Sequence, residues 1–249
     1  MQPVIVVKFG GSLSKNEKAR TLFFNDMVKL ARKNRVVLVH GGGPEINAWL
    51  DKLGLVSKFV GGLRYTDAGT LEVVEMVLDG KVNRDIVAQL NRRGARAVGL
   101  SGKDGKMLLC KTIEKLGFVG EPAKTDVSIL KLLVSKGYLP VVSSLGFNGR
   151  GDTLNVNADS LAMAIAAGLK ARELVLITDV AGVLDEHGKT IACIRSADVR
   201  NLLRRNVVTG GMIPKIKACC SAVSAGIKQV WIIDGSHGIA ARHGTVIKK

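Results

Sequence analysis

Apolar strands that end in glycine turns constrain this 249-residue chain more than any other feature. Val4–Lys8 is typical of a buried strand and ends in Gly10-Gly11-Ser12, after which apolar residues recur at helical spacing. Val36–Val39 repeats the pattern, since it ends in His40-Gly41-Gly42-Gly43 and Pro44 stands where helices favour their first residue. Successive strand, turn and helix units favour parallel strands, so the sequence predicts an α/β fold.

The alternation of strand and helix continues along the chain. Residues 54–69 look irregular, and the turn-rich segment Gly146–Asp152 resembles a hairpin. Gly94 is a plausible end of a helix. Helical patterns cover Leu71–Leu78, Val82–Leu90, Ile129–Leu133, an alanine-rich stretch from Asp159 to Gly168, Ala197–Arg205 and Met212–Ala225, and strand patterns cover Ala97–Leu100, Met107–Lys111, Leu139–Ser143, Glu173–Ile177, Val230–Ile233 and Thr245–Ile247.

These elements predict one open, mainly parallel central sheet sandwiched by helices, which is a three-layer αβα architecture. No linker rich in Pro, Ser or charge divides the chain. We therefore expect two lobes, residues 1–171 and residues 172–249, on one continuous sheet.

The charge balance points to an anionic partner. Lys and Arg number 37 and Asp and Glu number 21, which gives a formal net charge of +16. Such an excess attracts nucleic acid, nucleotide phosphate or an acidic protein. Nucleic acid is the weakest of these predictions, because only two Trp, two Tyr and six Phe are available for base stacking. No apolar run is long enough to cross a bilayer and no leader pattern opens the chain, so we expect a cytosolic protein without a membrane partner.

Ligands of open parallel sheets bind beyond the carboxyl ends of the strands, where glycine turns and helix N-termini present backbone N–H groups to anions. Three strand ends or helix starts carry glycines, at Gly10-Gly11, at Gly41-Gly42-Gly43 and at Gly210-Gly211. A single glycine turn often reflects only a tight bend. This chain has three such glycine turns, and Lys8 and Lys215 lie beside two of these turns, which favours phosphate binding.

The usual nucleotide-binding signatures are missing. Gly188-Lys189-Thr190 resembles the end of a P-loop, but Val183 stands where that motif needs glycine, so a turn between short strands is the better prediction. No G-x-G-x-x-G opens a helix, and no kinase H-R-D or D-F-G set occurs. The Cys and His residues show no zinc-ligand spacing, so we predict no protein metal site.

Six motifs, taken together, resemble the amino acid kinase superfamily in their order and spacing. Two of them, around Gly62–Asp67 and Asn155–Asp159, resemble its acetylglutamate branch. The resemblance runs from residue 4 to about residue 235. The six motifs are Val7-Lys8-Phe9-Gly10-Gly11-Ser12, Val39-His40-Gly41-Gly42-Gly43-Pro44, Gly62-Leu63-Arg64-Tyr65-Thr66-Asp67, Asn155-Val156-Asn157-Ala158-Asp159, Thr178-Asp179-Val180-Ala181-Gly182-Val183 and Gly210-Gly211-Met212-Ile213-Pro214-Lys215.

The resemblance implies ATP-dependent phosphorylation of the side-chain carboxylate of N-acetyl-L-glutamate, the second step of arginine and ornithine biosynthesis. It implies that Lys8 lies nearer the attacking carboxylate and Lys215 nearer the leaving oxygen, with Asp159 orienting both ammonium groups. Backbone N–H groups at Gly10, Gly11, Gly42 and Gly43 would bind the phosphoryl oxygens. The alternative for Lys8 is an ordinary solvated lysine at a strand end.

The resemblance also implies two ligand pockets, with the acyl-amino-acid in the first lobe and ATP in the second. Arg64, Asn155 and Asn157 would bind the substrate, whereas Asp179, Gly211 and Met212 would bind the adenosine part of ATP. Mg²⁺ would be held mainly by ATP oxygens and water. The alternative is that Arg64 is a surface residue and the asparagines are turn or helix caps.

Many relatives carry an N-terminal helix that links dimers into hexamers and serves feedback inhibition by arginine. The first strand here begins at residue 4, so we expect a homodimer that arginine does not inhibit. One alternative function is a kinase for aminoadipate or glutamate attached to an acidic carrier protein, which the positive charge would attract. Another is a non-catalytic nucleotide-binding regulator, although Lys8, Asp159 and Lys215 are all present.

Overall fold

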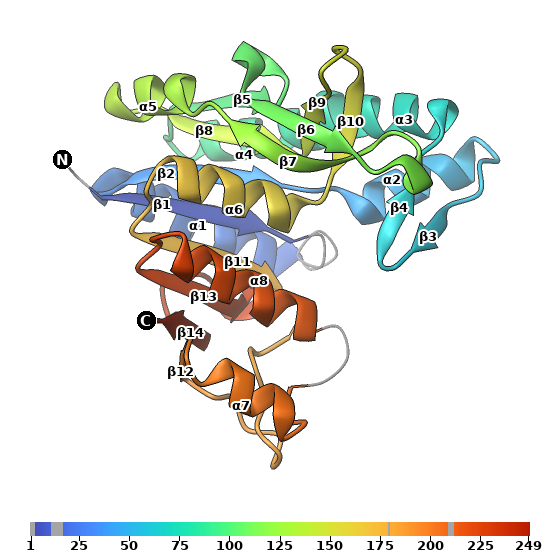
Figure 1. Ribbon diagram of the computed structural model, residues 1–249. Helices are drawn as coiled ribbons and strands as arrows, with labels where there is room; N and C mark the ends of the chain where they lie inside the picture. Colours follow the sequence, from blue (N-terminus) through green and yellow to red (C-terminus); the bar gives the residue numbers. More distant parts are fainter. Residues whose placement is uncertain (1–2, 11–16, 179, 209–211) are drawn as a thin grey trace.

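One eight-stranded sheet runs through the computed structural model, which describes residues 3–10, 17–178, 180–208 and 212–249 (Figure 1). Its order is β12-β14-β13-β11-β1-β2-β8-β5, and neighbouring strands are parallel except β13 and β14. The predicted mainly parallel sheet is confirmed. The strands are β1 Val4–Phe9, β2 Arg35–His40, β5 Ala97–Ser101, β8 Leu139–Ser143, β11 Glu173–Thr178, β12 Cys193–Arg195, β13 Gln229–Asp234 and β14 Gly244–Lys248.

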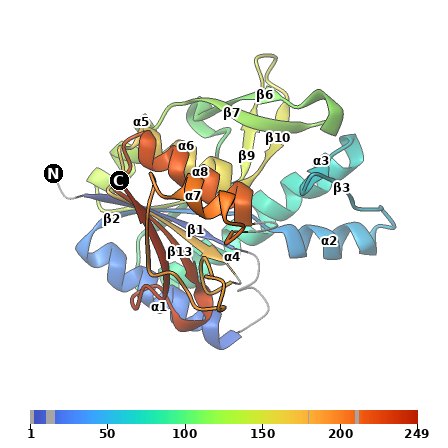
Figure 2. The ribbon, with the colours of Figure 1, turned by 60° about the horizontal axis from the view of Figure 1, so that its bottom comes forward.

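Helices cover both faces of this sheet because its central strands are apolar on both faces (Figure 2). In β1, Val6 packs against one layer of helices, whereas Ile5 and Val7 pack against the other. This explains why the strand is a continuous apolar run and not an alternating one. One layer contains α5 Ser128–Ser135, α6 Ala158–Gly168 and α8 Met212–Ser224, and the other contains α1 Glu17–Lys33 and α4 Arg84–Arg92. The three-layer prediction is therefore confirmed.

A small β-barrel lies beside the sheet, at the top of Figure 1. The predicted hairpin at Gly146–Asp152 is part of it, because β9 and β10 pair antiparallel around this segment. The barrel strands are β6 Leu108–Thr112, β7 Val119–Thr125, β9 Leu145–Phe147 and β10 Thr153–Val156. Short elements outside the sheet and barrel are α7 Val199–Arg204 and the 3₁₀ turns Asp104–Lys106, Glu114–Leu116 and Gly235–His237.

The expectation that residues 54–69 are irregular is wrong for part of this segment. After α2 Gly43–Lys52, the strands β3 Lys58–Val60 and β4 Leu63–Tyr65 form an antiparallel hairpin. Gly61 and Gly62 turn the hairpin at positive φ values of 57° and 81°, which side chains with a Cβ rarely adopt. Each strand has only three residues, and this length is too short for an alternating pattern to be visible in the sequence.

Three helical segments follow the hairpin without a break. They are α3 Ala68–Glu75, a π-helical segment Met76–Asn83 and α4. Gly94 follows α4 at φ 84° and lies at the helix end, as predicted. The π-helical segment was not predicted, and it faces the candidate site described below.

The sheet joins both predicted lobes, because β11 of the second lobe pairs with β1 of the first. The boundary near Ala171 itself stays a prediction. Among the described residues, no helix is both long and apolar enough to span a membrane.

Candidate active site

Six of the residues predicted for the site line one cavity at the carboxyl ends of the central strands. This cavity, the glycine-turn cavity, has a volume of about 280 Å³. Phe59 and Ser144 also contribute to its wall. The predicted residues in the lining are Lys8, Gly42, Gly43, Arg64, Asn155 and Asn157. Four separate segments of the chain therefore meet where the sequence patterns placed a ligand.

The glycine turn after β2 begins helix α2. Gly42 is the N-cap and Gly43 is the first helical residue, so Pro44 is the second helical residue, one position after the predicted one. The first N–H groups of a helix have no partner within the helix, and the helix dipole adds partial positive charge there. A Cβ on Gly42 would lie 2.8 Å from Cδ2 of Leu78, so the turn packs closely against the π-helical segment. The arrangement suits an anionic ligand.

A buried histidine, His40, is hydrogen-bonded to the backbone of this turn. Nδ1 of His40 lies 2.9 Å from the carbonyl oxygen of Gly41, and Nδ2 of Asn83 lies 3.0 Å from Nε2 of His40. The same Asn83 amide donates to the carbonyl of Val141 at 2.9 Å. Burial lowers the pKa of His40 to about 4, so the imidazole is neutral at pH 7. A neutral ring that donates from Nδ1 and accepts at Nε2 fits both contacts.

Gly10 directly follows β1 and lies next to β11. A Cβ at this position would lie 2.6 Å from the carbonyl oxygen of Ile177 and 3.7 Å from Nζ of Lys8. Only glycine allows the two strands to approach this closely beside the lysine. Gly11, which was predicted to bind phosphoryl oxygens, lies outside the described residues.

Lys8 and Asp159 form an ion pair at the edge of the cavity. Nζ of Lys8 lies 2.9 Å from Oδ1 of Asp159, and the two side chains are 15% and 25% exposed. Asp159 is in the first turn of α6, where partial positive charge from the helix N-terminus favours a carboxylate. The pair brings together residues that lie 151 positions apart in the sequence, as the family resemblance implies.

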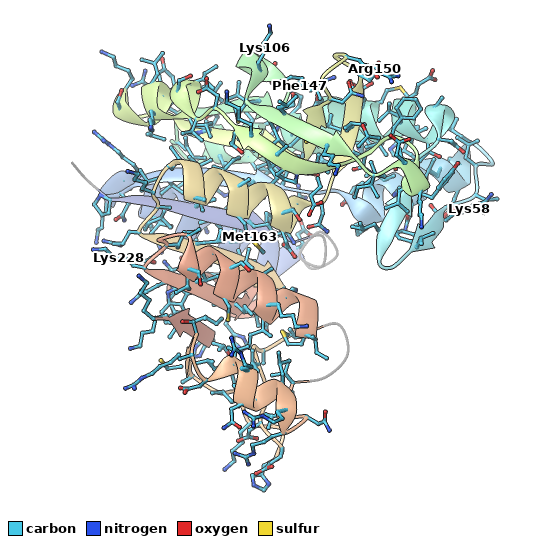
Figure 3. The ribbon with its side chains drawn as sticks, in the orientation of Figure 1. Lys58, Lys106, Phe147, Arg150, Met163 and Lys228 are labelled. Carbon is cyan, nitrogen blue, oxygen red and sulfur yellow. The ribbon has the colours of Figure 1, made fainter. Side chains whose placement is uncertain are left out.

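Lys215 lies in the adjoining space. Its ammonium group donates to Oγ1 of Thr178 at 3.2 Å. Asp159, Asn157 and Lys215 line a further cavity of about 550 Å³, the Lys215 cavity, whose wall includes Met163 (labelled in Figure 3) between α6 and α8. Asn157 lines both cavities, so they adjoin.

The charges of Asp159 and Lys215 both affect the pKa of the Cys219 thiol in α8. The pKa of Cys219 is raised to about 12, mainly by burial and in part by the charge of Asp159, whereas the charge of Lys215 acts to lower it. Both charges therefore act on the same point of α8. Asp159 contacts Lys8 directly and shares a cavity with Lys215; a role in orienting both ammonium groups stays a prediction.

Arg64 is buried, at 8% exposure, and not the surface residue that the alternative supposed. Its guanidinium donates to Oγ of Ser57 at 2.6 Å and to Oδ1 of Asn47 at 2.5 Å, and it lies 4.7 Å from the ring centre of Phe59. Burial lowers its pKa, although an arginine remains protonated at pH 7. Among the described residues no carboxylate forms an ion pair with it, so its charge is available to an anionic ligand.

Asn155 and Asn157 line the glycine-turn cavity. Nδ2 of Asn155 donates to Oγ1 of Thr66 at 3.2 Å. Asn157 is the N-cap of α6, and its side-chain oxygen accepts from the N–H groups of Asp159 and Ser160. The cap uses only the oxygen, so the amide NH₂ group of Asn157 can donate to a ligand. The capping alternative is thus correct for Asn157 and compatible with ligand binding.

The ATP side of the site is described only in part. Met212 begins α8, three residues before Lys215. Asp179 and Gly211, both predicted to bind ATP, lie outside the described residues. Within the described part of the chain, no cluster of three or more His, Cys, Asp or Glu side chains could hold a metal ion.

The sequence patterns missed the residues that position the predicted ones. Asn47 and Ser57 hold Arg64, and Asn83 holds His40. Nothing in the spacing of these residues indicates a role, because each acts through a tertiary contact. Thr178, which holds Lys215, lies within a motif that was singled out only for its neighbour Asp179.

Comparisons with known proteins identify the family and the fold of the chain. The model of the "Amino acid kinase family" matches residues 3–234. The acetylglutamate kinase of Endomicrobium trichonymphae is 48% identical over 249 residues, which cover all of both chains. That of Pelobacter propionicus is 44% identical over 244 residues, covering 92% of this chain and 84% of its own. The crystal structure of smu.665 from Streptococcus mutans has a TM-score of 0.82 at 30% identity, covering 100% of this chain and 99% of that one.

Proposed function

The chain belongs to the amino acid kinase family, and on this premise we propose that it transfers the γ-phosphoryl group of ATP to the side-chain carboxylate of N-acetyl-L-glutamate. The product is N-acetylglutamyl 5-phosphate, an acyl phosphate of the arginine and ornithine route. Two relatives that are 48% and 44% identical over nearly the whole chain are acetylglutamate kinases, which supports this substrate.

The Lys8–Asp159 ion pair beside the N-terminus of α2 is the observation that carries the proposal. A carboxylate is already ionised at neutral pH, so the reaction needs no general base. The obstacle is instead the repulsion between two anions. Fixed cations and N–H donors reduce this repulsion and stabilise the charge on the transferring group.

Each cation has a place in this reaction. Lys8, in the glycine-turn cavity, is on the side of the attacking carboxylate, and Lys215, in the adjoining cavity, is on the side of the leaving oxygen. The N–H groups of Gly42 and Gly43 would donate to the transferring phosphoryl group between them. Asp159 holds the ammonium group of Lys8 in place, because it is itself fixed at the start of α6.

Arg64 and the asparagines would bind the acceptor. The guanidinium of Arg64 keeps neutral partners on one side and lines the cavity, so it can pair with the α-carboxylate of the substrate. The amide groups of Asn155 and Asn157 would then contact the acetamido group. A cavity of about 280 Å³ suits a small acyl-amino-acid.

ATP is the phosphoryl donor, as in other kinases of the family. Mg²⁺ would arrive with the phosphate oxygens of ATP and keep several water ligands, because this ion rarely needs a dedicated protein cage. When bound, it would neutralise charge on the phosphate chain. Asp179, Gly211 and Met212 stay the proposed contacts of the adenosine part.

The homodimer also remains a proposal. Phe59, Val60 and Met76 expose more than half of their apolar side chains, at 55%, 57% and 59%. Such residues are common where a second protein chain packs. Light scattering would test the proposal, since a dimer has twice the mass of the 26.5 kDa chain.

The substrate can be tested by measuring ADP release with different acceptors. N-acetylglutamate, N-acetylaminoadipate, aspartate and UMP would be compared at equal concentration. The proposal expects turnover with free N-acetylglutamate far above the others. Turnover that requires an acidic carrier protein and falls steeply with salt would replace it with the carrier-linked alternative.

A further inference from the structure

A separate cavity lies at the opposite edge of the sheet, where the parallel strands begin. We call it the amino-edge cavity; its volume is about 300 Å³. It lies among the connections that lead into β2, β5 and β8, which are neighbours in the sheet. The N-terminus marks this edge in Figure 1. The candidate active site is at the carboxyl ends of the strands, so this cavity is not part of it.

The three connections around the amino-edge cavity are strongly basic. Residues 30–36, 91–97 and 134–139 contain no Asp or Glu. They contain seven basic residues, Arg32, Lys33, Arg35, Arg92, Arg93, Arg96 and Lys136. Part of the net charge of +16 is therefore concentrated at this edge of the sheet. Phosphoryl transfer at the other edge does not explain this concentration.

Basic residues also occur at helix C-termini for a structural reason, because the helix dipole places partial negative charge there. Helices α1, α4 and α5 all end near this edge. Each end carries about half a negative charge, so the three together amount to roughly −1.5. Seven cations exceed this several-fold, and the excess leaves the edge positive.

Three arginines line the cavity without carboxylate partners among the described residues. Arg32, Arg35 and Arg96 line it, and within the described chain none of them forms an ion pair. A Cβ on Gly94 would lie 3.8 Å from Nη2 of Arg32, so the first and second connections approach each other closely.

The third guanidinium is held in place. Nη1 of Arg96 donates to the carbonyl of Lys136 at 3.2 Å, and the guanidinium carbon lies 4.1 Å from the ring centre of Tyr138. Tyr138 also lines the cavity. The N–H of Leu139 donates to the carbonyl of Arg96 at 2.9 Å, which ties the second connection to the third. Arg96 is thus partly preorganised for a ligand.

We propose that the amino-edge cavity binds the phosphate chain of a compact di- or triphosphate. Planar guanidinium groups bind phosphate oxygens in pairs, and three of them match a chain with several charges. A cavity of about 300 Å³ is at the small end of ligand sites and does not need a large partner. Inorganic triphosphate and the phosphate chain of a nucleotide share this chemistry. The proposal is independent of the kinase assignment.

Calorimetric titration with inorganic triphosphate at low salt tests the proposal. The active site can bind the same probe, so each variant is also titrated with Lys215→Gln in the background. The combined change Arg32→Gln, Arg35→Gln and Arg96→Gln should weaken binding at the amino-edge cavity by at least roughly tenfold, since each lost charge-assisted contact contributes strongly. The combined change without Lys215→Gln should leave kinase turnover unchanged.

Two further variants distinguish binding at the amino-edge cavity from nonspecific electrostatic attraction to a basic protein. Lys106→Gln, Lys124→Gln and Arg150→Gln remove the same charge from the barrel side, where Lys106 and Arg150 project at the top of Figure 3, and should leave binding intact. Ala31→Glu keeps the three arginines but adds a carboxylate to the lining, and should weaken binding as well. It covers the case in which the triple variant fails to fold.

The outcomes are distinct. In the Lys215→Gln background, an equal loss of inorganic triphosphate and nucleoside triphosphate binding in the triple arginine variant supports a site for phosphate alone. A larger loss of nucleotide binding supports a site that extends to the nucleoside. Undiminished binding after both changes at the cavity overturns the proposal. An equal loss in the barrel-side control, or binding of long RNA without binding of triphosphate, also overturns it.

Discussion

At the scale of single residues, neutral partners hold the buried guanidinium of Arg64. Arg64 donates to Ser57 and Asn47. Neutral partners fix the geometry of a charged side chain without cancelling its charge. Binding of an anionic ligand offsets the cost of burying Arg64 without an anionic partner, and this favours an anion over a neutral ligand.

Arg64→Lys tests this principle on the acceptor side. Lysine keeps the charge but loses the planar fork that reaches Ser57, Asn47 and a ligand at once. We expect KM for N-acetylglutamate to rise by roughly 10- to 100-fold, equivalent to about 1.5–3 kcal/mol, with a smaller change in kcat and none in KM for ATP. Steady-state kinetics measures this split, and Arg150→Lys on the exposed hairpin is the control. An unchanged KM for the acceptor would remove Arg64 from the pocket.

His40 predicts how stability depends on pH. The folded protein keeps this ring neutral down to pH about 4, whereas an unfolded chain protonates it near 6.5. Between these values the unfolded state binds more protons, so stability falls as the pH decreases. From pH 6.5 to 4, the free energy of unfolding should fall by about 3 kcal/mol more in the natural protein than in His40→Gln. Urea unfolding at several pH values measures this, and parallel curves for the two proteins would contradict it.

At the scale of elements, helix starts and strand ends form the site. Helices α2 and α6 both begin at the glycine-turn cavity, and β1 ends there. The N-cap of α6 combines two roles in one side chain, because Asn157 caps with its oxygen and faces both cavities.

Substitutions of Asn157 can separate these roles. Asn157→Ala removes the cap and should cost about 1 kcal/mol of stability as well as activity. Asn157→Asp keeps an oxygen for the cap, so stability should stay near that of the natural protein. It also replaces the NH₂ donors by a negative charge that repels anionic substrates, so kcat/KM should fall. Chemical unfolding and kinetics of both variants check this; full activity in Asn157→Asp would leave Asn157 with capping alone.

Gly10 sets how closely β1 and β11 approach. In Gly10→Ala the new methyl group would meet the backbone of Ile177 at 2.6 Å, and the strands must separate. We expect a loss of roughly 1–3 kcal/mol in the free energy of unfolding. Gly43→Ala is the matched control, because no atom lies within 4 Å of its added Cβ. Equal stability of the two variants by urea unfolding would show that the close approach is not rigid.

Elements with strong local patterns were predictable, and those without were not. Strands such as Val4–Phe9 are buried on both faces and therefore stand out as apolar runs. The hairpin β3–β4, in which only β3 is exposed throughout, has no such pattern. Gly61-Gly62 between Val60 and Leu63 is nevertheless a typical hairpin turn and could have revealed it. The π-helical segment packs against the glycine turn, and this tertiary contact has no signal in the local sequence.

At the scale of the whole molecule, the sheet separates two basic regions. One contains the candidate active site at the carboxyl ends of the strands, and the other contains the amino-edge cavity. Lys228 lies on the left in Figure 3, the side on which Figure 1 marks the N-terminus. The sequence predicted the positive charge but not its distribution, because the connections come together only when β2, β8 and β5 pair.

The same limit applies to the Lys8–Asp159 ion pair. Periodicity places Lys8 at a strand end and Asp159 near a helix start, but it does not indicate that α6 packs against β1. Strand pairing over long separations decides this contact, and only the resemblance to a known family predicted it. Neither the sequence patterns nor the family resemblance predicted the contacts that Asn47, Ser57 and Asn83 make.

The turnover of Lys8→Met with ATP and N-acetylglutamate tests the central claim most directly. Methionine keeps much of the length of the lysine side chain but removes the ammonium group, with its charge and its N–H donors. Lys228→Met is the control, because Lys228 lies at the amino edge of the sheet and away from the candidate active site. We predict a fall in kcat of roughly 100- to 1,000-fold, the usual effect of losing a preorganised group that stabilises transition-state charge. The control should retain normal turnover. Near-normal turnover of Lys8→Met would contradict the account.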